Sequence, residues 1–349
     1  ALYVGQPVAI VVAETLAQAA DAAIVVKIDY EPLEAVSDLE DAAQDMHPPL
    51  HPSMGSNVGA YAHVLGGDVE GAFSSCDRVV SGSFTLPRIS PMPMECRGVL
   101  ASYDSASNEL TFRSSNQSPH GMKEHLDEVL DIPADIRVLT PDVGGGFGQK
   151  HNLYAEDVAL AYLAYKLQKP VRWIETRGEN IHALHARGVK AHLDVAVDGT
   201  GHILGIKGRF IADLGAFWVS GTFTSPDNTL KRVTGPYDIP AYEAELFGVV
   251  TNRPPMGAYR GAGQPEATYC MERMVDLVAH ELGLDPVDVR RRNLIKPGQF
   301  PYTTIAGIPY VDGDYEPVLD EALHVIAYDE LKEARARARE EGRLVGIGV

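Results

Sequence analysis

The sequence predicts an α+β fold in which a small α/β unit precedes a larger domain of mixed sheets and helices. Strand and helix patterns alternate within the first 45 residues. From Asp68 onward, apolar and polar residues alternate in the manner of paired strands. Residues 136–175 then read as a strand, a glycine-rich loop, a helix and a second strand. Because strands and helices are interspersed without one regular repeat, a mixed α+β architecture is favoured over a uniform one.

The first unit spans residues 1–45. Residues 2–12 and 24–30 are rich in β-branched side chains and are predicted as strands. Between them, Thr15 and Gln18 have the spacing of a capping box that opens an alanine-rich helix. The segment from Met46 to Gly67 holds three prolines and four glycines, so we predict a linker over residues 46–66 and a domain boundary near residue 65.

The larger domain is predicted over residues 67–312 from strand patterns, helix caps and turn signals. Ser118-Pro119 is a typical start for a helix, and Asp198-Gly199 is a hairpin signal. The predicted strands are 78–86, 97–103, 109–114, 136–139, 171–175 and a hairpin within 191–212. The predicted helices begin at 119, at 154, directly after the turn 260–265, and at 286.

The last segment, residues 313–349, is predicted as a connecting helix at 315–341, solvated on its charged face, followed by the start of a strand at 345–349. The chain starts without methionine and stops inside this apolar run, so we expect it to be part of something longer. No internal repeat is visible.

Composition narrows the function. A hydrophobic fraction of 45% is ordinary for a globular protein, and the formal net charge of -18 disfavours nonspecific binding to nucleic acid or anionic membranes. No apolar run reaches the roughly 20 residues of a membrane span. Three cysteines without a C-x-x-C pair disfavour a disulfide framework, a zinc site or an iron-sulfur cluster in this chain. We therefore expect buried, reduced thiols and a cytoplasmic location.

The most distinctive stretch is the run from Val143 to Lys150, which has four glycines in five positions. Glycines at this density serve positive φ angles or close approach of the backbone to another group. Bare amides before a helix form a ready anion site. The run matches neither the P-loop, which ends in Gly-Lys-Ser/Thr, nor the dinucleotide-binding G-x-G-x-x-G pattern. A tight turn without a ligand and a ligand-binding loop both stay open, and a nucleotide-binding protein is a weaker third possibility.

Four motifs occur along the chain in an order that resembles the pattern of a known family. They are residues 91–98 (PMPMECRG), 115–120 (SNQSPH), 142–148 (DVGGGFG) and 257–267 (GAYRGAGQPEA). Together they resemble the large subunits of the molybdenum hydroxylases, the family of xanthine dehydrogenase, aldehyde oxidase and aerobic carbon monoxide dehydrogenase. Residues 4–9 and 29–33 are similar to the later part of that family's α/β hammerhead domain. The resemblance implies a partial hammerhead domain, the first molybdopterin-binding domain, and a chain incomplete at both ends.

The resemblance also implies a cofactor, molybdenum bound by molybdopterin in its cytosine dinucleotide form, whose dithiolene holds the metal without a protein side chain as ligand. Gln117, Phe147 and Arg260 match residues near the molybdenum, and an amide or guanidinium there can donate hydrogen bonds to oxygen ligands. The residues that match cofactor contacts are Gln117, Gly144, Gly145, Gly146, Phe147, Gly148, Arg260 and Gly261. The residues that match the substrate pocket are Glu95, His151 and Ala262.

This chain differs from known members of the family at positions that narrow the range of possible substrates. Carbon monoxide dehydrogenases carry a cysteine immediately after the second-loop arginine, where this chain has Gly261. Xanthine dehydrogenases carry a glutamate at the position of His151 and an aromatic residue at that of Ala262. Carbon monoxide and purines are therefore disfavoured, and an aldehyde or an N-heterocycle remains.

The family's catalytic base, a glutamate in a Gly-x-Gly-Glu context, has no counterpart here, so we expect no catalytic residue in this chain. The resemblance implies that the missing part, or a separate chain with the second molybdopterin-binding domain, supplies it and that water provides the oxygen. Electrons would leave through a 2Fe-2S small subunit and an FAD medium subunit. Alone, the chain is expected to be incomplete and inactive. A cofactor-free scaffold of the same fold is the alternative.

Each site residue also has a purely structural interpretation. Gln117 could satisfy backbone groups before a helix cap, and Arg260 could bridge to Glu266. Glu95 is favoured as a buried, hydrogen-bonded carboxylate in a structural or cavity-wall role, and His151 as a pocket-wall or helix N-terminal residue. Three histidines whose spacing fits no zinc pattern are interpreted as surface residues: His182, His185 and His192.

Overall fold

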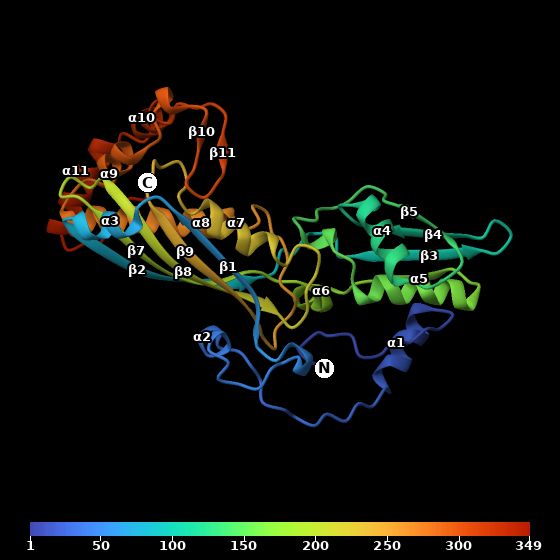
Figure 1. Cartoon of the computed structure of the whole chain (residues 1–349). Coiled ribbons are helices and arrows are strands. Elements are labelled where there is room, and N and C mark those ends of the chain that lie inside the picture. The colour runs from blue at the N-terminus through green and yellow to red at the C-terminus, as the bar shows by residue number, and fades with distance from the viewer.

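The computed structural model describes all 349 residues as an elongated molecule with one β-sheet unit at each end. Figure 1 shows the five-stranded sheet on the left and the four-stranded sheet on the right, with connecting loops and α6 (Arg177–Ala183) between them. No helix is long and apolar enough to cross a membrane. The α+β class predicted from the sequence is confirmed by these mixed sheets and their helices.

The five-stranded sheet has the order β1-β9-β8-β7-β2. Its strands are β1 (Val58–Gly66), β2 (Arg78–Ile89), β7 (Ala186–Val197), β8 (Ile203–Gly215) and β9 (Tyr242–Val250). β7 and β8 form the predicted hairpin, whereas β8 and β9 run parallel. The carboxyl ends of two parallel strands lie at one edge of a sheet, so the loops after β8 and β9 leave the sheet together.

Alternation along β8 assigns helices to the two faces of this sheet. Phe210 and Leu214 belong to the main buried cluster with α8 (Gln264–Leu282), while Ile211 packs with α2 (Leu39–Ala43). Since successive strand residues point to opposite faces, α8 and α2 cover opposite sides. The remaining helices in contact with this sheet are α3 (Val69–Ser75) and α7 (Thr224–Arg232).

The four-stranded sheet has the order β5-β4-β3-β6. Its elements are β3 (Gly98–Asp104), β4 (Glu109–Ser114), β5 (Asp135–Leu139) and β6 (Val171–Ile174), with helices α4 (Pro119–Val129) and α5 (Ala155–Leu167). Buried residues of both helices pack with the same inward-facing strand residues, so one face is covered. The predicted sequence of strand, glycine loop, helix and strand is confirmed, although β5 and β6 lie at opposite edges.

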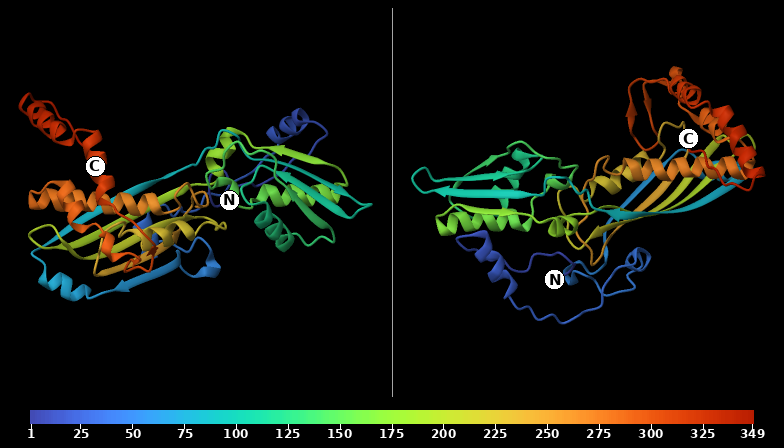
Figure 2. Two further views of the ribbon diagram at one scale, coloured as in Figure 1. Left: turned by 90° about the horizontal axis from the view of Figure 1, so that it is seen from above. Right: turned by 180° about the vertical axis from the view of Figure 1, so that it is seen from behind.

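The remaining elements lie outside the five-stranded and four-stranded sheets. They are α1 (Leu16–Ile24), α9 (Pro286–Asn293), β10 (Tyr302–Thr303), β11 (Pro309–Tyr310), α10 (Glu316–Val325), α11 (Tyr328–Glu340) and the 3₁₀ turns Pro52–Met54, Gln149–His151 and Pro297–Gln299. Figure 2 shows α10 and α11 at the end of the molecule remote from the four-stranded sheet, and α1 to one side of that sheet.

The two N-terminal strands predicted at 2–12 and 24–30 are absent. Their apolar side chains are exposed, as at Val4 and Ile10. A strand needs a neighbour for its backbone hydrogen bonds, and no strand of this structure pairs with either segment. The intervening helix does form, and its predicted capping box at Thr15 and Gln18 is confirmed.

Three further predictions need correction. Residues 58–66, inside the predicted linker, form edge strand β1. It pairs with β9 from Val58 opposite Val249 to Gly66 opposite Tyr242, and local sequence does not reveal so distant a partner. The helix predicted at 315–341 breaks at Ala327, whose φ of 49° is incompatible with a continuous α-helix, and residues 345–349 form no strand. All three cysteines are free, but only Cys270 is buried, because the other two lie outside the cores.

Candidate functional site

Two glycine-rich loops meet between the two sheets. The first loop, residues 143–150, follows β5, and the second, residues 257–263, follows β9 and leads into α8. The Arg260 N–H donates a hydrogen bond to the Phe147 carbonyl over 3.0 Å. Gly148 has a φ of 105°, and a Cβ there would lie 2.1 Å from the Ala258 carbonyl oxygen. The loops therefore pack backbone to backbone, which only a residue without a side chain permits at this position.

The first loop leaves three successive amides unused. The N–H groups of Gly145, Gly146 and Phe147 donate no hydrogen bond within the protein. Phe147 has a φ of 54°, and its side chain is 42% exposed. Consecutive free amides beside residues with positive φ form an anion-binding concavity. The loop can thus accept an anionic or oxygen-rich group on its backbone.

Gln117 lies directly against this loop. Its side-chain Oε1 accepts a hydrogen bond from the Gly148 N–H over 2.9 Å, and its own N–H donates to the Lys150 carbonyl over 2.8 Å. A Cβ at Gly146 would lie 2.3 Å from the same Oε1. The Gln117 Nε2 has no partner in the protein, so this exposed amide retains a free donor beside the free backbone amides.

The neighbouring helix α4 starts as predicted, with Ser118 as its N-cap and Pro119 in the first turn. Ser118 makes no side-chain capping hydrogen bond at the start of α4. Instead, the Ser118 N–H donates to the Asn116 side chain over 3.0 Å. The structural alternative predicted for Gln117 was that it satisfies backbone groups. It does so at the glycine loop, where its side-chain oxygen accepts from the Gly148 N–H.

A cluster of Glu95, Lys150 and Ser115 ties the first loop to its surroundings. Glu95 Oε2 accepts from Lys150 Nζ over 2.7 Å, from Ser115 Oγ over 2.7 Å and from the Gly144 N–H over 2.6 Å. Burial raises the pKa of Glu95, but the hydrogen bonds from Lys150, Ser115 and Gly144 outweigh it and leave the pKa below its ordinary value. The Lys150 side chain is 0% exposed and that of Glu95 is 40% exposed, so the predicted burial of Glu95 is wrong, whereas its hydrogen bonding is confirmed.

Arg260 is exposed, and its guanidinium forms no ion pair or hydrogen bond in the chain. The predicted bridge from Arg260 to Glu266 is wrong, because Glu266 is paired with Arg187 over 2.6 Å. Sequence reasoning missed Arg187, which lies 79 positions before Glu266 and has no motif around it. Arg260 therefore keeps all of its side-chain donors available.

The rest of the second loop is held in left-handed backbone conformations. Gly261, Ala262 and Gly263 have φ angles of 103°, 43° and 91°. A Cβ at Gly263 would lie 2.0 Å from the Ser225 carbonyl oxygen at the start of α7. The Asn228 side chain donates to the Ala262 carbonyl over 2.8 Å. The loop is thus fixed by α7 on one side and by the first loop on the other.

The predicted histidines differ in exposure: His192 is exposed as predicted, whereas His182 is partly buried. His151 is exposed, and its N–H donates to the Gly148 carbonyl over 3.3 Å. His185 is partly buried: burial and nearby Arg88 lower its pKa to about 4, and its ring contacts the Ile181 carbonyl over 2.9 Å. Histidine spacing alone does not reveal this partial burial.

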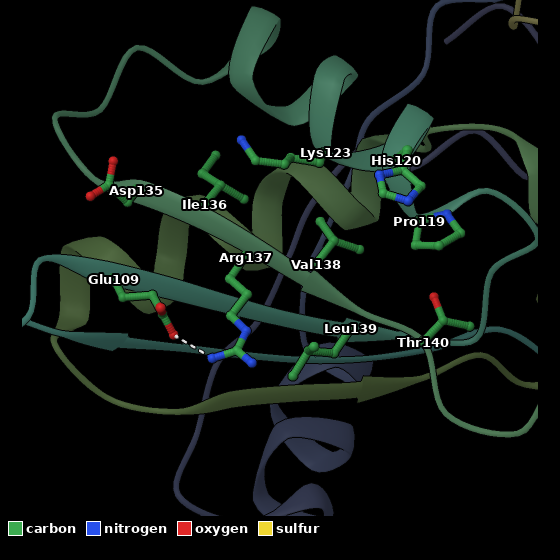
Figure 3. A pocket seen from close by; sticks show the side chains of 10 residues that line it. All are labelled: Glu109, Pro119, His120, Lys123, Asp135, Ile136, Arg137, Val138, Leu139 and Thr140. Carbon is green, nitrogen blue, oxygen red and sulfur yellow. Dashed lines mark ion pairs between the residues drawn. The ribbon is translucent and has the colours of Figure 1, made fainter.

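A pocket of about 480 Å³ lies outside the two loops. Figure 3 shows it along β5 and the first turn of α4, with Arg137 facing Glu109 across a 3.8 Å ion pair. Its lining residues are Glu109, Pro119, His120, Lys123, Asp135, Ile136, Arg137, Val138, Leu139 and Thr140. None of the predicted site residues lines it, so its volume does not define the site.

The donor set fits an oxygen-rich, anionic cofactor better than a metal ion bound by side chains. Free donors come from the first-loop amides, Gln117 and Arg260, and the missing side chains at Gly144 and Gly146 leave room for the Glu95 and Gln117 side chains against the loop. No group of three or more His, Cys, Asp or Glu residues could hold a metal ion. This donor set is typical of a site that holds an oxygen-rich or anionic ligand through backbone amides and neutral or cationic side chains.

Comparison with known proteins identifies the family. The profile of the molybdopterin cofactor-binding domain matches residues 50–294. The chain is 34% identical to the nicotine 6-hydroxylase large subunit of Paenarthrobacter nicotinovorans, covering 99% of this chain and 43% of the relative. It is 35% identical to the carbon monoxide dehydrogenase large chain of Hydrogenophaga pseudoflava, covering 99% and 46%. The chain belongs to the molybdenum hydroxylase large-subunit family, as its four motifs predicted.

Solved structures agree with the sequence comparison. Quinoline 2-oxidoreductase from Pseudomonas putida 86 superposes with a TM-score of 0.89 at 33% identity, over 95% of this chain and 42% of that chain. A reconstituted carbon monoxide dehydrogenase from Oligotropha carboxidovorans gives a TM-score of 0.84 at 31% identity, over 94% and 43%. The chain therefore spans less than half the length of each of these four relatives.

Proposed function

We propose that this chain is the first cofactor-binding segment of a molybdenum-dependent hydroxylase that oxidises an aldehyde or an N-heterocycle with oxygen from water. The observation that carries the proposal is the contact of the two glycine loops, which brings the free donors of Gln117 and Arg260 beside the free amides of the first loop. When bound, the molybdenum cofactor accepts two electrons as the substrate gains oxygen.

The residues of this chain bind and orient that cofactor. The amides of Gly145, Gly146 and Phe147 and the side-chain amide of Gln117 donate hydrogen bonds to its oxygen atoms. The guanidinium of Arg260 donates from the second loop and carries a compensating positive charge. Gly148 and Gly261 supply the positive φ angles of the two loops, and Gly144 leaves room for the Glu95 side chain against the first loop. No catalytic base is assigned to this chain.

Fewer contacts within the protein support the proposed substrate side of the site. His151 and Ala262 lie on the first and second loops and would line the pocket. Glu95 is assigned to the support of the first loop, because its Oε2 already accepts three hydrogen bonds from the protein. The names of the nicotine and quinoline relatives support an N-heterocycle as the first substrate class to assay.

The wider assembly extends this proposal. The cofactor is proposed in its cytosine dinucleotide form, with 2Fe-2S and FAD subunits as electron-transfer partners and the catalytic glutamate supplied by the remaining part of the large subunit or a separate chain, in the cytoplasm. Residues 1–45 would belong to a hammerhead domain and residues 67–312 to the first cofactor-binding domain, to which β1 adds residues 58–66. Residues 313–349 would lead to the second.

Replacement of Arg260 by alanine in the assembled enzyme tests the cofactor assignment. Loss of its donors should lower the molybdenum content, measured by inductively coupled plasma mass spectrometry, or the turnover of an N-heterocycle. Arg273→Ala is the matched control, because Arg273 lies on α8 but pairs with Asp276 on the exposed side. Unchanged molybdenum content and unchanged turnover in Arg260→Ala would reject the assignment.

The alternative, a scaffold of the same fold without cofactor, makes a different prediction. Protein purified from its native host would then contain no molybdenum and no pterin, even with its co-purifying chains present. Stoichiometric molybdenum together with a chain that carries the Gly-x-Gly-Glu segment would exclude the scaffold. The same preparation would identify the electron-transfer subunits by mass.

A further inference from the structure

Arg187 occupies an unusual backbone position at the start of β7. Its φ is 68°, and the next residue, Gly188, has a φ of 67°. Left-handed backbone conformations are uncommon for residues other than glycine. They persist where several contacts of the surrounding structure hold the backbone in place. A Cβ at Gly188 would lie 2.8 Å from the Arg88 side chain on the paired strand. Close packing at this point therefore fixes the backbone from which the Arg187 side chain extends.

The Arg187 guanidinium makes three contacts, all with the second cofactor loop or the helix that follows it. Its Nη1 lies 2.6 Å from Glu266 Oε2 in the first turn of α8. Its Nη2 donates to the Arg260 carbonyl oxygen over 3.1 Å. Its Cζ lies 5.0 Å from the centre of the Tyr259 ring, within the range of a cation–π contact. One side chain therefore joins the loop and the helix start.

These contacts fix the peptide groups on both sides of the Arg260 side chain. The Arg260 N–H is held by the Phe147 carbonyl, and its C=O is held by Arg187. Both backbone groups of the residue with the free guanidinium are thus tied, one to the first loop and one to β7. The direction in which the Arg260 side chain leaves the backbone depends on both ties.

We propose that Arg187 is a positioning residue that holds the second loop in register with the first, so that Arg260 faces the cofactor. The inference rests on the proposed function for its purpose, although the loop restraint itself does not. Glu266 is the anchor: its side chain is 1% exposed, and that of Arg187 is 12% exposed, so solvent competes little for the pair. Arginine suits this role because its planar fork donates in two directions at once, which a single ammonium does less well.

The test compares Arg187→Met and Arg187→Lys with Arg78→Met in the full chain and in the assembled enzyme. Arg78 on β2 also pairs with a glutamate of α8, Glu281, over 3.1 Å, but at the far end of the helix. Hydrogen–deuterium exchange of peptides covering residues 257–264 is read in the full chain without any need for cofactor. Molybdenum content and the separate kcat and KM values are read in the assembled enzyme.

Arg187→Met should raise amide exchange in residues 257–264 by about tenfold or more and lower the molybdenum content, whereas Arg78→Met should change neither. Arg187→Lys should keep the Glu266 pair and restore part of the protection, which also covers the case in which Arg187→Met does not fold. Unchanged exchange in both Arg187 variants would overturn the restraint. Increased exchange in a protein that contains no molybdenum in its unmodified form would retain the restraint and reject the proposed function instead.

Discussion

The pair formed by Glu95 and Lys150 predicts an asymmetric response to mutation. In Glu95→Gln, the ammonium of Lys150 stays buried and loses its only charged partner. In Lys150→Met, the carboxylate of Glu95 loses its charged partner but is 40% exposed and keeps its hydrogen bonds from Ser115 and the Gly144 N–H. We therefore expect Glu95→Gln to destabilise the protein more than Lys150→Met.

The magnitudes follow from the burial of the group that is left behind. An uncompensated buried charge costs roughly 3–5 kcal/mol. The Lys150 side chain is fully buried, so Glu95→Gln should approach the lower part of that range. Water can hydrate the Glu95 carboxylate in Lys150→Met, so the loss there should be on the order of one hydrogen bond to a charged group, about 1–2 kcal/mol. Equilibrium urea unfolding of both variants measures the difference.

The pH dependence provides a second measurement on the same pair. Because the folded-state pKa of Glu95 lies below its ordinary value of 4.5, its contribution to stability is present above that pH and is lost as the pH falls through the folded pKa. Glu95→Gln should lack this part of the acid-induced loss. Equal destabilisation by the two variants, or a larger loss in Lys150→Met, would refute the argument that the exposure of the remaining charge decides the cost.

Two further predictions concern single positions. Gly146→Ala should displace the Gln117 side chain, since the new Cβ would lie 2.3 Å from its Oε1, and should lower the molybdenum content of the assembled enzyme. The control is Gly298→Ala, because a Cβ at Gly298 would meet no other atom within 4 Å. Equal molybdenum content in the two variants would contradict the prediction. His185 has a folded pKa of about 4, below its unfolded value near 6.5, so the unfolded chain binds more protons between these values and stability should fall as the pH drops from 6.5 to 4. His185→Gln should lose this dependence in urea unfolding across that pH range, and an unchanged dependence would show that another group causes it.

The sequence predicted those parts of the site that depend on local motifs. The glycine run, the segment with Gln117 and the second loop with Arg260 were each visible as residue patterns, and the structure brings all three together. Glycine patterns are predictive because a position with positive φ or close backbone approach accepts almost no residue but glycine. Most side-chain contacts can be made by several residue types. Gly148 against the Ala258 carbonyl is such a case.

The parts that sequence reasoning missed depend on distant partners. β1 has its strand conformation because β9 pairs with it, from Val58 opposite Val249 to Gly66 opposite Tyr242. Conversely, residues 2–12 have strand propensity and no partner strand, so propensity alone produced a wrong prediction. Arg187 was missed for the same reason, since its partner Glu266 is distant in sequence and a plausible nearer partner, Arg260, was available.

The two glycine-rich loops come from different sheet units, so the proposed cofactor site depends on how these units dock against each other. The first loop belongs to the four-stranded sheet and the second to the five-stranded sheet, and the bond between Arg260 and Phe147 crosses from one to the other. A ligand that contacts both loops binds only when the units are docked, so it stabilises the docked state by a free energy that grows with the logarithm of its concentration divided by its dissociation constant. The free donors of Gln117 and Arg260 come from different units, and neither unit alone presents the full donor set. Changes far from the loops that loosen this docking should therefore weaken cofactor binding even when both motifs are intact.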